Sequence, residues 1–450
     1  MVLQTFKDRE KELEELDEVI SSEKFELVII YGRRRIGKTE LILKATENRK
    51  KLYYLAVGEK NLERFYNLFA ERYAEVSKLK MDWEILLDFL KDRIEVLVID
   101  EFQNLIQENE NILNIFQSST DMILKNSKIK LFLLGSSISM MTSKVFYYKS
   151  PLYGRRTGSM ELKAISFFEL NRFFPERSMK ELVEIYGFGD GIPHYLVKID
   201  CEFWHWLYKE IRMERSFIKD EVDFLMRYEF SDMSTYKLIL EAVAHGKTKL
   251  NDIKDFIKVK RTDISPYLSN LLEVKMIKRI VPITENNNSR MGRYYISDNF
   301  IKFWFRFIYP NLSSIEEGIF DTEMIRKEYS NYLGPIFEEI ARQFLILNRG
   351  KDFDFTKIGK WWFKEREIDI IALNENTGEI FFCECKWQDR VSARRIFEEL
   401  KEKALHVEWR NEKRHERYVI FAKSFKERIN EPGLLLFDLK DMEDKIRYVI

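Results

Sequence analysis

An eight-residue run near the N-terminus, GRRRIGKT at residues 32–39, constrains the fold of this chain more than any other segment. The run fits the pattern G-x-x-x-x-G-K-[ST], in which two glycines let backbone N–H groups converge on one point. It follows an apolar stretch, residues 25–31, that predicts a buried strand, and it precedes a stretch that predicts a helix, TELILKATEN. Strand, glycine loop and helix in this order predict a site that holds phosphate groups at a helix N-terminus. A plain glycine turn between two core elements is the alternative reading of the same residues.

The positions of this loop have expected tasks at a bound nucleoside triphosphate. Gly32 and Gly37 supply the turn, and Lys38 reaches the β- and γ-phosphates. Thr39 offers its hydroxyl to Mg²⁺. The whole loop is expected to hold the nucleotide, which adds the intervening residues Arg33, Arg34, Arg35 and Ile36. Three adjacent arginines repel one another, so they require an anionic counterpart, which is nucleotide, carboxylate or nucleic acid.

Three further apolar runs alternate with helical stretches up to about Leu162, at residues 51–57, 96–101 and 130–135. Such alternation predicts a parallel sheet that helices cover on both faces. The run VLVIDE ends in Asp100 and Glu101 at the carboxyl end of its strand, which is where ligands bind in open α/β sheets. We expect Asp100 to hold the Mg²⁺ shell and Glu101 to orient or deprotonate the attacking water.

Two later segments add candidate catalytic residues. The run LFLLGSS ends at Ser136 and Ser137, which we expect to hydrogen-bond the γ-phosphate or the water, although a serine-rich turn is the alternative. The loop SPLYGRRTG carries Arg155 and Arg156. A guanidinium there is expected to stabilise charge on the transferring phosphoryl group, in the same chain or from a neighbouring subunit, and a solvated arginine pair is the alternative.

Composition excludes several classes of protein. Lysine plus arginine equals aspartate plus glutamate at 75 each, so the total charge does not predict a polyanionic partner. The three cysteines, Cys201, Cys383 and Cys385, cannot build a disulfide framework and indicate a reducing, cytoplasmic environment. The N-terminus lacks an apolar signal core, and no apolar run is long enough to span a bilayer, so we expect no membrane partner.

Six motifs occur in order along the chain: FKDREKELEEL, GRRRIGKT, LVIDEFQN, LLGSSISMM, SPLYGRRTG and GDGIPHYL. Together they resemble the archaeal ATPase family, in the STAND branch of AAA+-like P-loop NTPases. The resemblance implies an ATP-binding, Mg²⁺-dependent ATPase core in which Arg9 belongs to the segment that frames the nucleotide. It also implies that Pro193, with Gly191 and Ile192, lies against the base. By themselves the residues GDGIP predict only a turn.

The middle of the chain predicts a winged helix-turn-helix. TYKLILEAVAHG and KLNDIKDFI read as helices, and Thr262 is a plausible N-cap for a third helix with Pro266 in its first turns. KMIKRIVPI and RYYISD then read as two strands around a polar loop. Residues 246–293 hold eleven Lys/Arg and five Asp/Glu, an excess of six positive charges. This excess favours DNA contact at the helix start and wing, through Lys258, Lys260, Arg261, Arg290 and Arg293. The alternative is a regulatory lever that only packs against the ATPase.

A second chemical constellation lies past Gly334. Gly334-Pro335 predicts the start of the helix PIFEEIARQFLILN, with Glu338 at the edge of its apolar stripe. The strand EIDIIAL carries Asp369, and the strand EIFFCECKW carries Glu384 and Lys386 on one face. Carboxylate oxygens of Glu338, Asp369 and Glu384 suit Mg²⁺ or Mn²⁺, and Lys386 is expected to position or activate a hydrolytic water.

This set resembles the PD-(D/E)XK nuclease fold, although Ile368 stands where the family name has proline. A buried Asp–Lys–Glu network kept only for structure is the alternative. The neighbouring Trp361 and Trp362 face either a nucleic-acid backbone or the core.

The sequence as a whole predicts an α/β chain of four parts. These are a P-loop ATPase core (1–165), a helical lid (166–230), a winged helix-turn-helix (231–310) and a restriction-endonuclease-like α/β domain (311–450). The leading functional hypothesis is a DNA-associated ATPase, able to form homo-oligomers, whose nucleotide cycle moves a metal-dependent nuclease domain. The competing hypothesis is a STAND-type signalling switch whose C-terminal fold is a non-catalytic docking module.

Overall fold

The computed structural model describes residues 7–258 and 263–447, and contacts within the chain divide it into two compact units. The first unit comprises residues 1–164, 192–195 and 225–231. The second comprises residues 165–191, 196–224 and 232–450. None of the helices in the described part combines the length and apolarity that crossing a membrane requires.

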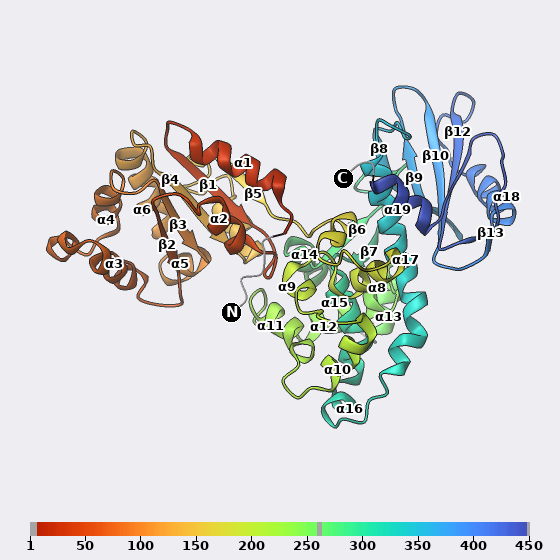
Figure 1. Cartoon of the computed structure of the whole chain (residues 1–450), viewed down its shortest axis with the longest axis horizontal. Helices are drawn as coiled ribbons and strands as arrows, with labels where there is room; N and C mark the ends of the chain where they lie inside the picture. The colour runs from red at the N-terminus through yellow and green to blue at the C-terminus, as the bar shows by residue number, and fades with distance from the viewer. Residues whose placement is uncertain (1–6, 259–262, 448–450) are drawn as a thin grey trace. The chain divides into compact units, whose positions relative to one another are not determined.

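The first unit is built on a five-stranded parallel sheet in the order β2-β3-β4-β1-β5. The strands alternate with helices along the chain (Figure 1). The prediction of a parallel sheet covered on both faces is confirmed, since side chains of both strand faces are buried. The strands are β1 (Glu26–Tyr31), β2 (Lys51–Leu55), β3 (Val96–Asp100), β4 (Lys130–Gly135) and β5 (Gly158–Glu161). The helices are α1 (Glu10–Ser21), α2 (Lys38–Ala45), α3 (Asn61–Arg72), α4 (Trp83–Leu90), α5 (Gln103–Glu108), α6 (Ile112–Ser119) and α7 (Ile138–Met140).

Two details of this sheet differ from the sequence prediction. β3 ends at Asp100, and Glu101 has a φ of 53°, so the chain turns sharply at the residue that was predicted to end the strand. A fifth strand, β5, pairs beside β1 although its sequence GSME carries no apolar run. An edge strand needs only one paired neighbour, so its side chains need not be buried.

The second unit begins with helices around an aromatic core. Ring contacts join Phe188 with Phe203, Phe300 and Phe303, and Tyr329 packs on Phe203. The helices of this part are α8 (Met179–Gly189), α10 (Phe203–Arg212), α12 (Ser234–Ala244), α13 (Leu250–Phe256), α14 (Ser265–Glu273), α15 (Asn299–Phe303) and α16 (Leu312–Glu316). Two short helices, α9 (Pro193–Leu196) and α11 (Glu221–Arg227), carry the chain across the boundaries of the units.

The helices α12, α13 and α14 are followed by an antiparallel hairpin of β6 (Ile277–Ile280) and β7 (Arg293–Ile296). This is the element order that the sequence predicts for a winged helix. Lys260, Arg261 and Thr262 lie outside the described residues.

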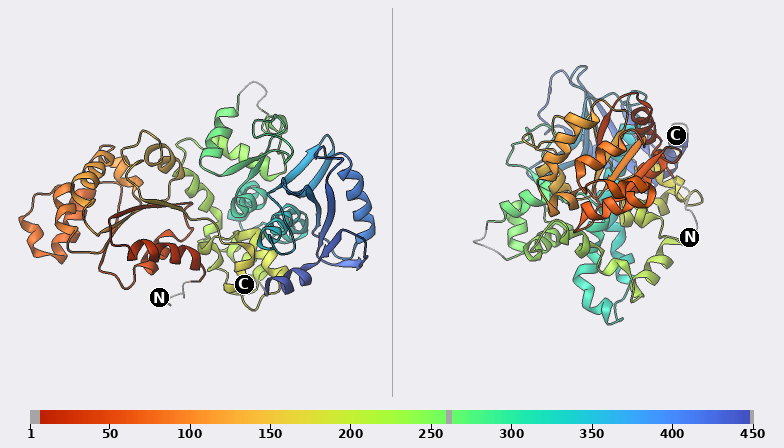
Figure 2. Two further views of the ribbon diagram at one scale, coloured as in Figure 1. Left: turned by 90° about the horizontal axis from the view of Figure 1, so that it is seen from above. Right: turned by 90° about the vertical axis from the view of Figure 1, so that its left-hand side faces the viewer.

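The later part of the second unit is a mixed five-stranded sheet in the order β14-β12-β10-β9-β8. Its strands are β8 (Lys357–Phe363), β9 (Arg366–Leu373), β10 (Glu379–Lys386), β12 (His415–Ala422) and β14 (Leu434–Phe437). The helices α17 (Glu323–Leu347) and α18 (Ala393–Ala404) pack on β10, and the sheet lies between a teal and a blue helix in the left view of Figure 2. A two-stranded sheet, β11 (Val391–Ser392) with β13 (Phe425–Glu427), and α19 (Leu439–Arg447) complete this part.

The prediction that Gly334-Pro335 begins a helix is wrong, because α17 runs from Glu323 through Pro335 to Leu347 without a break. Proline removes one backbone donor and crowds the preceding turn, which costs about 3 kcal/mol in a helix interior. The turns before it are anchored strongly enough to offset this cost. Tyr329 and Tyr332 are buried, and their hydroxyls donate to the carbonyls of Glu184 and Gly187 on α8, each at 2.8 Å.

Candidate functional site

The glycine loop joins the end of β1 to the start of α2, as the sequence predicts. Gly32 has a φ of 152°, and a Cβ there would lie 2.5 Å from the carbonyl oxygen of Leu162. Gly37 has a φ of 93° and is the N-cap of α2, with open space where a Cβ would be. Gly32 is therefore required by a close backbone approach as well as by its conformation, and Gly37 by conformation alone.

Lys38 is the first residue of α2, and its ammonium folds back onto the loop. Nζ donates to the carbonyl oxygens of Gly32 at 3.0 Å and Arg33 at 3.1 Å. Burial lowers the pKa of Lys38 to about 8, although Glu101 and Asp100 oppose the shift. The ammonium therefore lies next to the place where a phosphate is expected to bind. An anion bound there would favour the charged form of Lys38.

Asp100 and Thr39 meet at the carboxyl edge of the sheet. The Thr39 hydroxyl donates to Asp100 Oδ2 at 2.5 Å, and the Tyr53 hydroxyl donates to the same oxygen at 2.8 Å. Burial, the Asp100 charge and this hydrogen bond raise the pKa of Tyr53, so it remains a neutral donor. Hydroxyl and carboxylate oxygens together suit a hard cation such as Mg²⁺, so the donor set fits the predicted metal.

Glu101 is held by three neighbours that leave its carboxylate little freedom. It accepts hydrogen bonds from the Gln103 amide and the Ser136 hydroxyl, and Arg34 Nη2 lies 3.8 Å from its other oxygen. The Gln103 amide also donates to Ser136 Oγ at 3.1 Å. The arrangement fixes the direction in which Glu101 can accept a proton from a water.

Several residues of this site were missed by sequence reasoning. Gln103 follows Glu101 by two positions, so its place in the motif LVIDEFQN was the available signal. Tyr53 lies on β2, beside β3, and only the strand order brings it to Asp100. Tyr228 and Glu229 come from nearly 200 residues beyond the loop. The Arg34 guanidinium stacks 3.6 Å from the Tyr228 ring centre, and Glu229 accepts hydrogen bonds from Ser137 and Ser139.

Arg155 does not reach the phosphate loop of its own chain. β5 runs parallel to β1 with Gly158 beside Val28, so Arg155 lies level with the start of β1, and the loop follows its end. The offset of about seven residues corresponds to about 20 Å along a strand. Arg155 instead pairs with Asp121 at 3.0 Å. The prediction of a role in the same chain is wrong, and a role at a neighbouring subunit stays a prediction.

Of the other residues predicted to bind the nucleotide, Arg9 and Arg33 contact side chains elsewhere in the first unit. Arg9 is buried before α1, pairs with Glu12 at 2.9 Å and donates to the Lys163 carbonyl at 2.6 Å. The Arg33 guanidinium lies 5.9 Å from the ring of Tyr195, which follows Pro193 in α9. Ile36 is buried, and Arg35 takes a left-handed conformation with a φ of 70°.

The C-terminal constellation forms where β9 and β10 separate. Backbone pairing ends at Ile370 with Cys383, and Asp369 Oδ2 then accepts the N–H of Cys385 at 2.8 Å. Because the side chain replaces the missing ladder bond, Asp369 is pinned at the opening between the strands. Burial raises the pKa of Asp369 to about 8, and the charges of Glu338 and Glu384 add to the shift.

Lysines occupy the other two carboxylates. Glu384 accepts from Lys386 at 2.7 Å and from Lys403 of α18 at 2.9 and 3.0 Å. Glu338 of α17 is bonded to Lys360 of β8. The pairing of β8 with β9 is irregular between Gly359 and Trp361, and such a bulge re-aims the side chain at its centre, Lys360. Lys403 carried no signal in the sequence.

Oxygen donors of this kind suit Mg²⁺ or Mn²⁺, but their present arrangement does not fit a metal. Across the two described ranges, no three His, Cys, Asp or Glu side chains are placed to hold one ion. A divalent cation would have to displace the ammonium groups that already bind Glu338 and Glu384.

The β6–β7 hairpin is docked on β8 and β9. Arg293 Nη1 donates to Glu367 at 2.8 Å, and its guanidinium lies 4.4 Å from the ring centre of Trp362. The Trp362 indole donates to the Met291 carbonyl at 3.1 Å, and the Ile283 N–H donates to the Lys360 carbonyl at 2.8 Å. Arg293, predicted to contact DNA, is therefore occupied within the protein.

The other side chains that the sequence assigned to nucleic-acid contact are either buried or exposed. Trp361 and Trp362 are both buried, so they belong to the core rather than to an open surface. Lys258 and Arg290 remain exposed.

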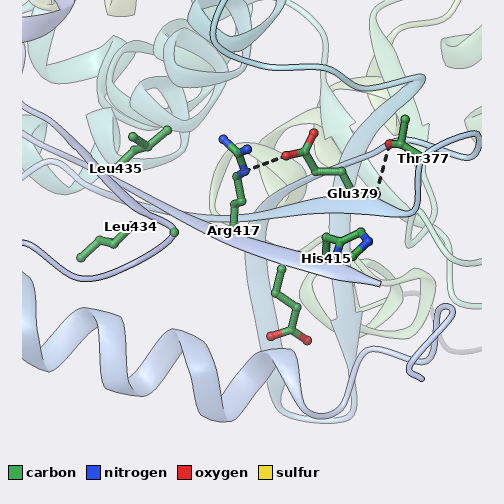
Figure 3. A pocket seen from close by; sticks show the side chains of 8 residues that line it. Thr377, Glu379, His415, Arg417, Leu434 and Leu435 are labelled. Carbon is green, nitrogen blue, oxygen red and sulfur yellow. Dashed lines mark hydrogen bonds and ion pairs between the residues drawn. The ribbon is translucent and has the colours of Figure 1, made fainter. Parts of the chain in front are cut away.

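A separate hollow of about 600 Å³ opens beside β10, β12 and the turn before β14 (Figure 3). Arg417 points to Glu379 there and pairs with it at 2.6 Å, next to His415 and Thr377. These residues lie near the starts of β10 and β12, whereas Glu384 and Lys386 lie at the end of β10. The hollow is therefore distinct from the carboxylate–lysine site.

Comparison with known protein families supports an ATPase domain in the first part of the chain. Residues 6–199 match a family described as an ATPase domain predominantly from Archaea. Residues 304–402 match a family described as "Archaea bacterial proteins of unknown function". The Walker-type ATPase PABY2304 of Pyrococcus abyssi has a similar fold, with a TM-score of 0.52 and 24% identity over 67% of this chain and 96% of that one.

Two proteins of Methanocaldococcus jannaschii are similar in sequence. An uncharacterised ATP-binding protein is 51% identical over 45 residues, which are 10% of this chain and 76% of that protein. The uncharacterised protein MJECL04 is 50% identical over 441 residues, which are 97% of this chain and 99% of the relative. The chain belongs to the same family as MJECL04, with an archaeal P-loop ATPase domain in its first part and a domain of unknown function in its second.

Proposed function

We propose that this chain binds and hydrolyses ATP with Mg²⁺ at the phosphate loop and couples this cycle to DNA association. The proposal rests on the meeting of Lys38, Thr39, Asp100 and Glu101 at the carboxyl edge of one parallel sheet. No single one of these residues is evidence for ATP hydrolysis by itself. Together they supply a ligand for phosphate, ligands for a metal ion and a proton acceptor.

Each residue around the loop has a defined task when ATP binds. The triphosphate draws the Lys38 ammonium from the carbonyls of Gly32 and Arg33 to its β- and γ-phosphates. Mg²⁺ would be held by Thr39 and Asp100 and would neutralise charge on the transferring phosphoryl group. Tyr53 keeps the Asp100 carboxylate oriented through its hydroxyl.

The proton acceptor is Glu101, which takes a proton from the water that attacks the γ-phosphorus. Gln103 and Ser136 hold its carboxylate in one orientation. Arg34 neutralises the same carboxylate before ATP arrives and moves to the phosphates afterwards, which frees Glu101 to accept the proton. The products are ADP and inorganic phosphate.

DNA association is supported by the charge and the element order of the middle part. Residues 246–293 carry an excess of six positive charges in a chain with equal numbers of both signs. Lys258 and Arg290 are exposed there, and three helices precede the antiparallel hairpin. Arg293 does not contribute, because Glu367 and Trp362 hold it.

An ATPase assay titrated with single-stranded, duplex and branched DNA tests the coupling. We expect at least one DNA form to raise the rate of phosphate release, and Lys38→Ala to abolish ATP binding. Lys44→Ala is the matched control, since Lys44 lies on the same helix but is exposed and pairs with Glu47 on the surface. If no DNA form binds or changes the rate while ATP is hydrolysed, the coupling is excluded.

A second candidate function is a STAND-type switch, in which ATP binding rather than turnover controls assembly. The observation that favours it is the contact of Arg34 with Tyr228 and of Ser137 and Ser139 with Glu229, since a distant segment then senses the nucleotide site. Sedimentation in ATP and in ADP distinguishes the two. Slow hydrolysis with oligomers that form only in ATP would favour the switch and support the predicted homo-oligomer.

Metal-dependent DNA cleavage at Asp369, Glu384 and Lys386 stays a prediction. The carboxylates are the right donors, but lysines already bind two of the three. Incubation of DNA with Mn²⁺, with the native protein and with Asp369→Asn, tests it directly. Cleavage that is lost in the variant would support a nuclease.

A further inference from the structure

The carboxylate–lysine site carries more positive than negative charge. Its three carboxylates are Glu338, Asp369 and Glu384. Its four lysines are Lys360, Lys386 and Lys403, which bind Glu338 and Glu384, and Lys302, whose ammonium lies over the ring of Tyr332 on the same helix as Glu338. The four ammonium groups exceed the carboxylates even when all three acids are ionised.

Lys302 is the lysine of this set without a carboxylate partner. Its ammonium lies 5.1 Å from the ring centre of Tyr332, and no ion pair to it occurs within residues 7–258 and 263–447. Burial lowers the pKa of Lys302 to about 8; Glu338 opposes the shift, while Lys360, Lys278 and Arg306 increase it. A cation in this position is unfavourable unless an anion joins it.

A divalent metal is a poor occupant of such a site. Both oxygens of Glu384 accept from Lys403, one of them also accepts from Lys386, and Glu338 is bonded to Lys360. A metal ion would therefore lose ammonium hydrogen bonds and enter a region that is already positive.

A phosphate group has the opposite requirements. It brings negative charge and acceptor oxygens, and lysine ammonium groups bind it as point charges with three donors each. The side chains of Lys360, Lys386 and Lys403 are 21%, 30% and 27% exposed, so each is partly open to solvent. Arg293 of the β6–β7 hairpin is not available to bind the phosphate, because its side chain is held by Glu367 and Trp362.

We propose that the separated ends of β9 and β10 form a metal-independent binding site for a phosphodiester of a nucleic-acid strand, with Lys403 and Lys386 on one side and Lys302 and Lys360 on the other. The inference rests on the proposed DNA association and names the residues that carry it. The bound phosphate takes over hydrogen bonds that the ammonium groups now make with Glu384 and Glu338.

The test measures binding of a fluorescent oligonucleotide to the full chain by anisotropy, in EDTA and over a series of salt concentrations. Native protein should bind in EDTA. Lys302→Met and Lys403→Met should each weaken binding and reduce the slope of log affinity against log salt by about 1, because each removes one phosphate contact. Lys351→Met is the matched control, since Lys351 is exposed before β8 and outside the site, and its slope should not change.

The use of two variants, Lys302→Met and Lys403→Met, separates a loss of binding from a loss of folding. Removing Lys403 leaves Glu384 with one ammonium fewer, whereas removing Lys302 leaves no ion-paired partner behind. Thermal melting of each variant shows whether the fold is retained.

The outcomes are distinct. DNA binding in EDTA with the native salt slope in both variants overturns the inference and leaves DNA association intact. Calorimetric binding of one Mn²⁺ that Asp369→Asn abolishes also overturns it, in favour of the metal site. Native protein that hydrolyses ATP but binds no oligonucleotide contradicts DNA association itself, and the inference falls with it.

Discussion

Replacing Gly32 by alanine should destabilise the ATPase unit more than the same replacement at Gly37. Both glycines have positive φ, 152° and 93°, so alanine is strained at each position. At position 32 the new methyl group would also lie 2.5 Å from the Leu162 carbonyl oxygen, while at position 37 nothing lies within 4 Å. The Leu162 oxygen belongs to the backbone and cannot rotate away as a flexible side chain would.

The magnitudes follow from these two contributions. An unfavourable backbone conformation costs about 1–3 kcal/mol, which is the whole expected effect of Gly37→Ala. Forcing a methyl group into occupied space adds about 1–3 kcal/mol, so Gly32→Ala should cost about 2–6 kcal/mol. Gly32→Ala should also weaken ATP binding, because the carbonyl that positions Lys38 moves with the backbone.

Hydrogen–deuterium exchange of the β1 and β5 amides is the suitable assay, since a chain of two compact units need not unfold in one step. The free energy of local opening should fall further in Gly32→Ala than in Gly37→Ala. Equal losses in the two variants would show that the Leu162 contact contributes nothing and would refute this reasoning.

Three further predictions concern single residues. Glu101→Gln should retain ATP affinity and lose about 10²–10⁴-fold in turnover, measured as phosphate release, because only the proton acceptor is removed. ATP affinity should be constant below pH 8 and fall by up to about tenfold per pH unit above it, because the Lys38 ammonium loses its proton there. Titration calorimetry at several pH values measures this affinity, and an affinity that does not change with pH would contradict the prediction. Arg293→Met should lower the free energy of local opening of the β6 and β7 amides by about 1–2 kcal/mol in hydrogen–deuterium exchange, because it removes a partly buried ion pair with Glu367 and a cation–π contact, and Arg290→Met should leave that free energy unchanged.

Much of the nucleotide site could be predicted because its residues are placed by local rules. A strand that ends in Asp100, and a loop that ends in Lys38 and Thr39, both point to the carboxyl edge of a parallel sheet. The strand at residues 130–135 has the predicted bounds, since each of its side chains is buried. Contacts between neighbouring strands were out of reach, and Tyr53 meets Asp100 only because β2 lies beside β3.

Other parts failed where packing overrides a local signal. Gly334-Pro335 reads as a helix start, yet the buried Tyr329 and Tyr332 anchor the turns before the proline, and the helix continues through it. Arg155 reads as a phosphate ligand, yet the pairing of β5 with β1 carries it to the opposite edge of the sheet. Lys403 drew no prediction, and only the packing of α18 on β10 brings it to Glu384.

The sequence by itself determined the phosphate loop, the parallel sheet and the set of Asp369, Glu384 and Lys386, because spacing along one chain decides which residues share a turn or a strand face. Only the tertiary structure decided which charges meet. Glu101 is held by Gln103, Ser136 and Arg34, and the hairpin arginine is held by Glu367. Such pairs form between segments far apart in sequence, and whether a carboxylate faces a metal or a lysine depends on packing that no local pattern encodes.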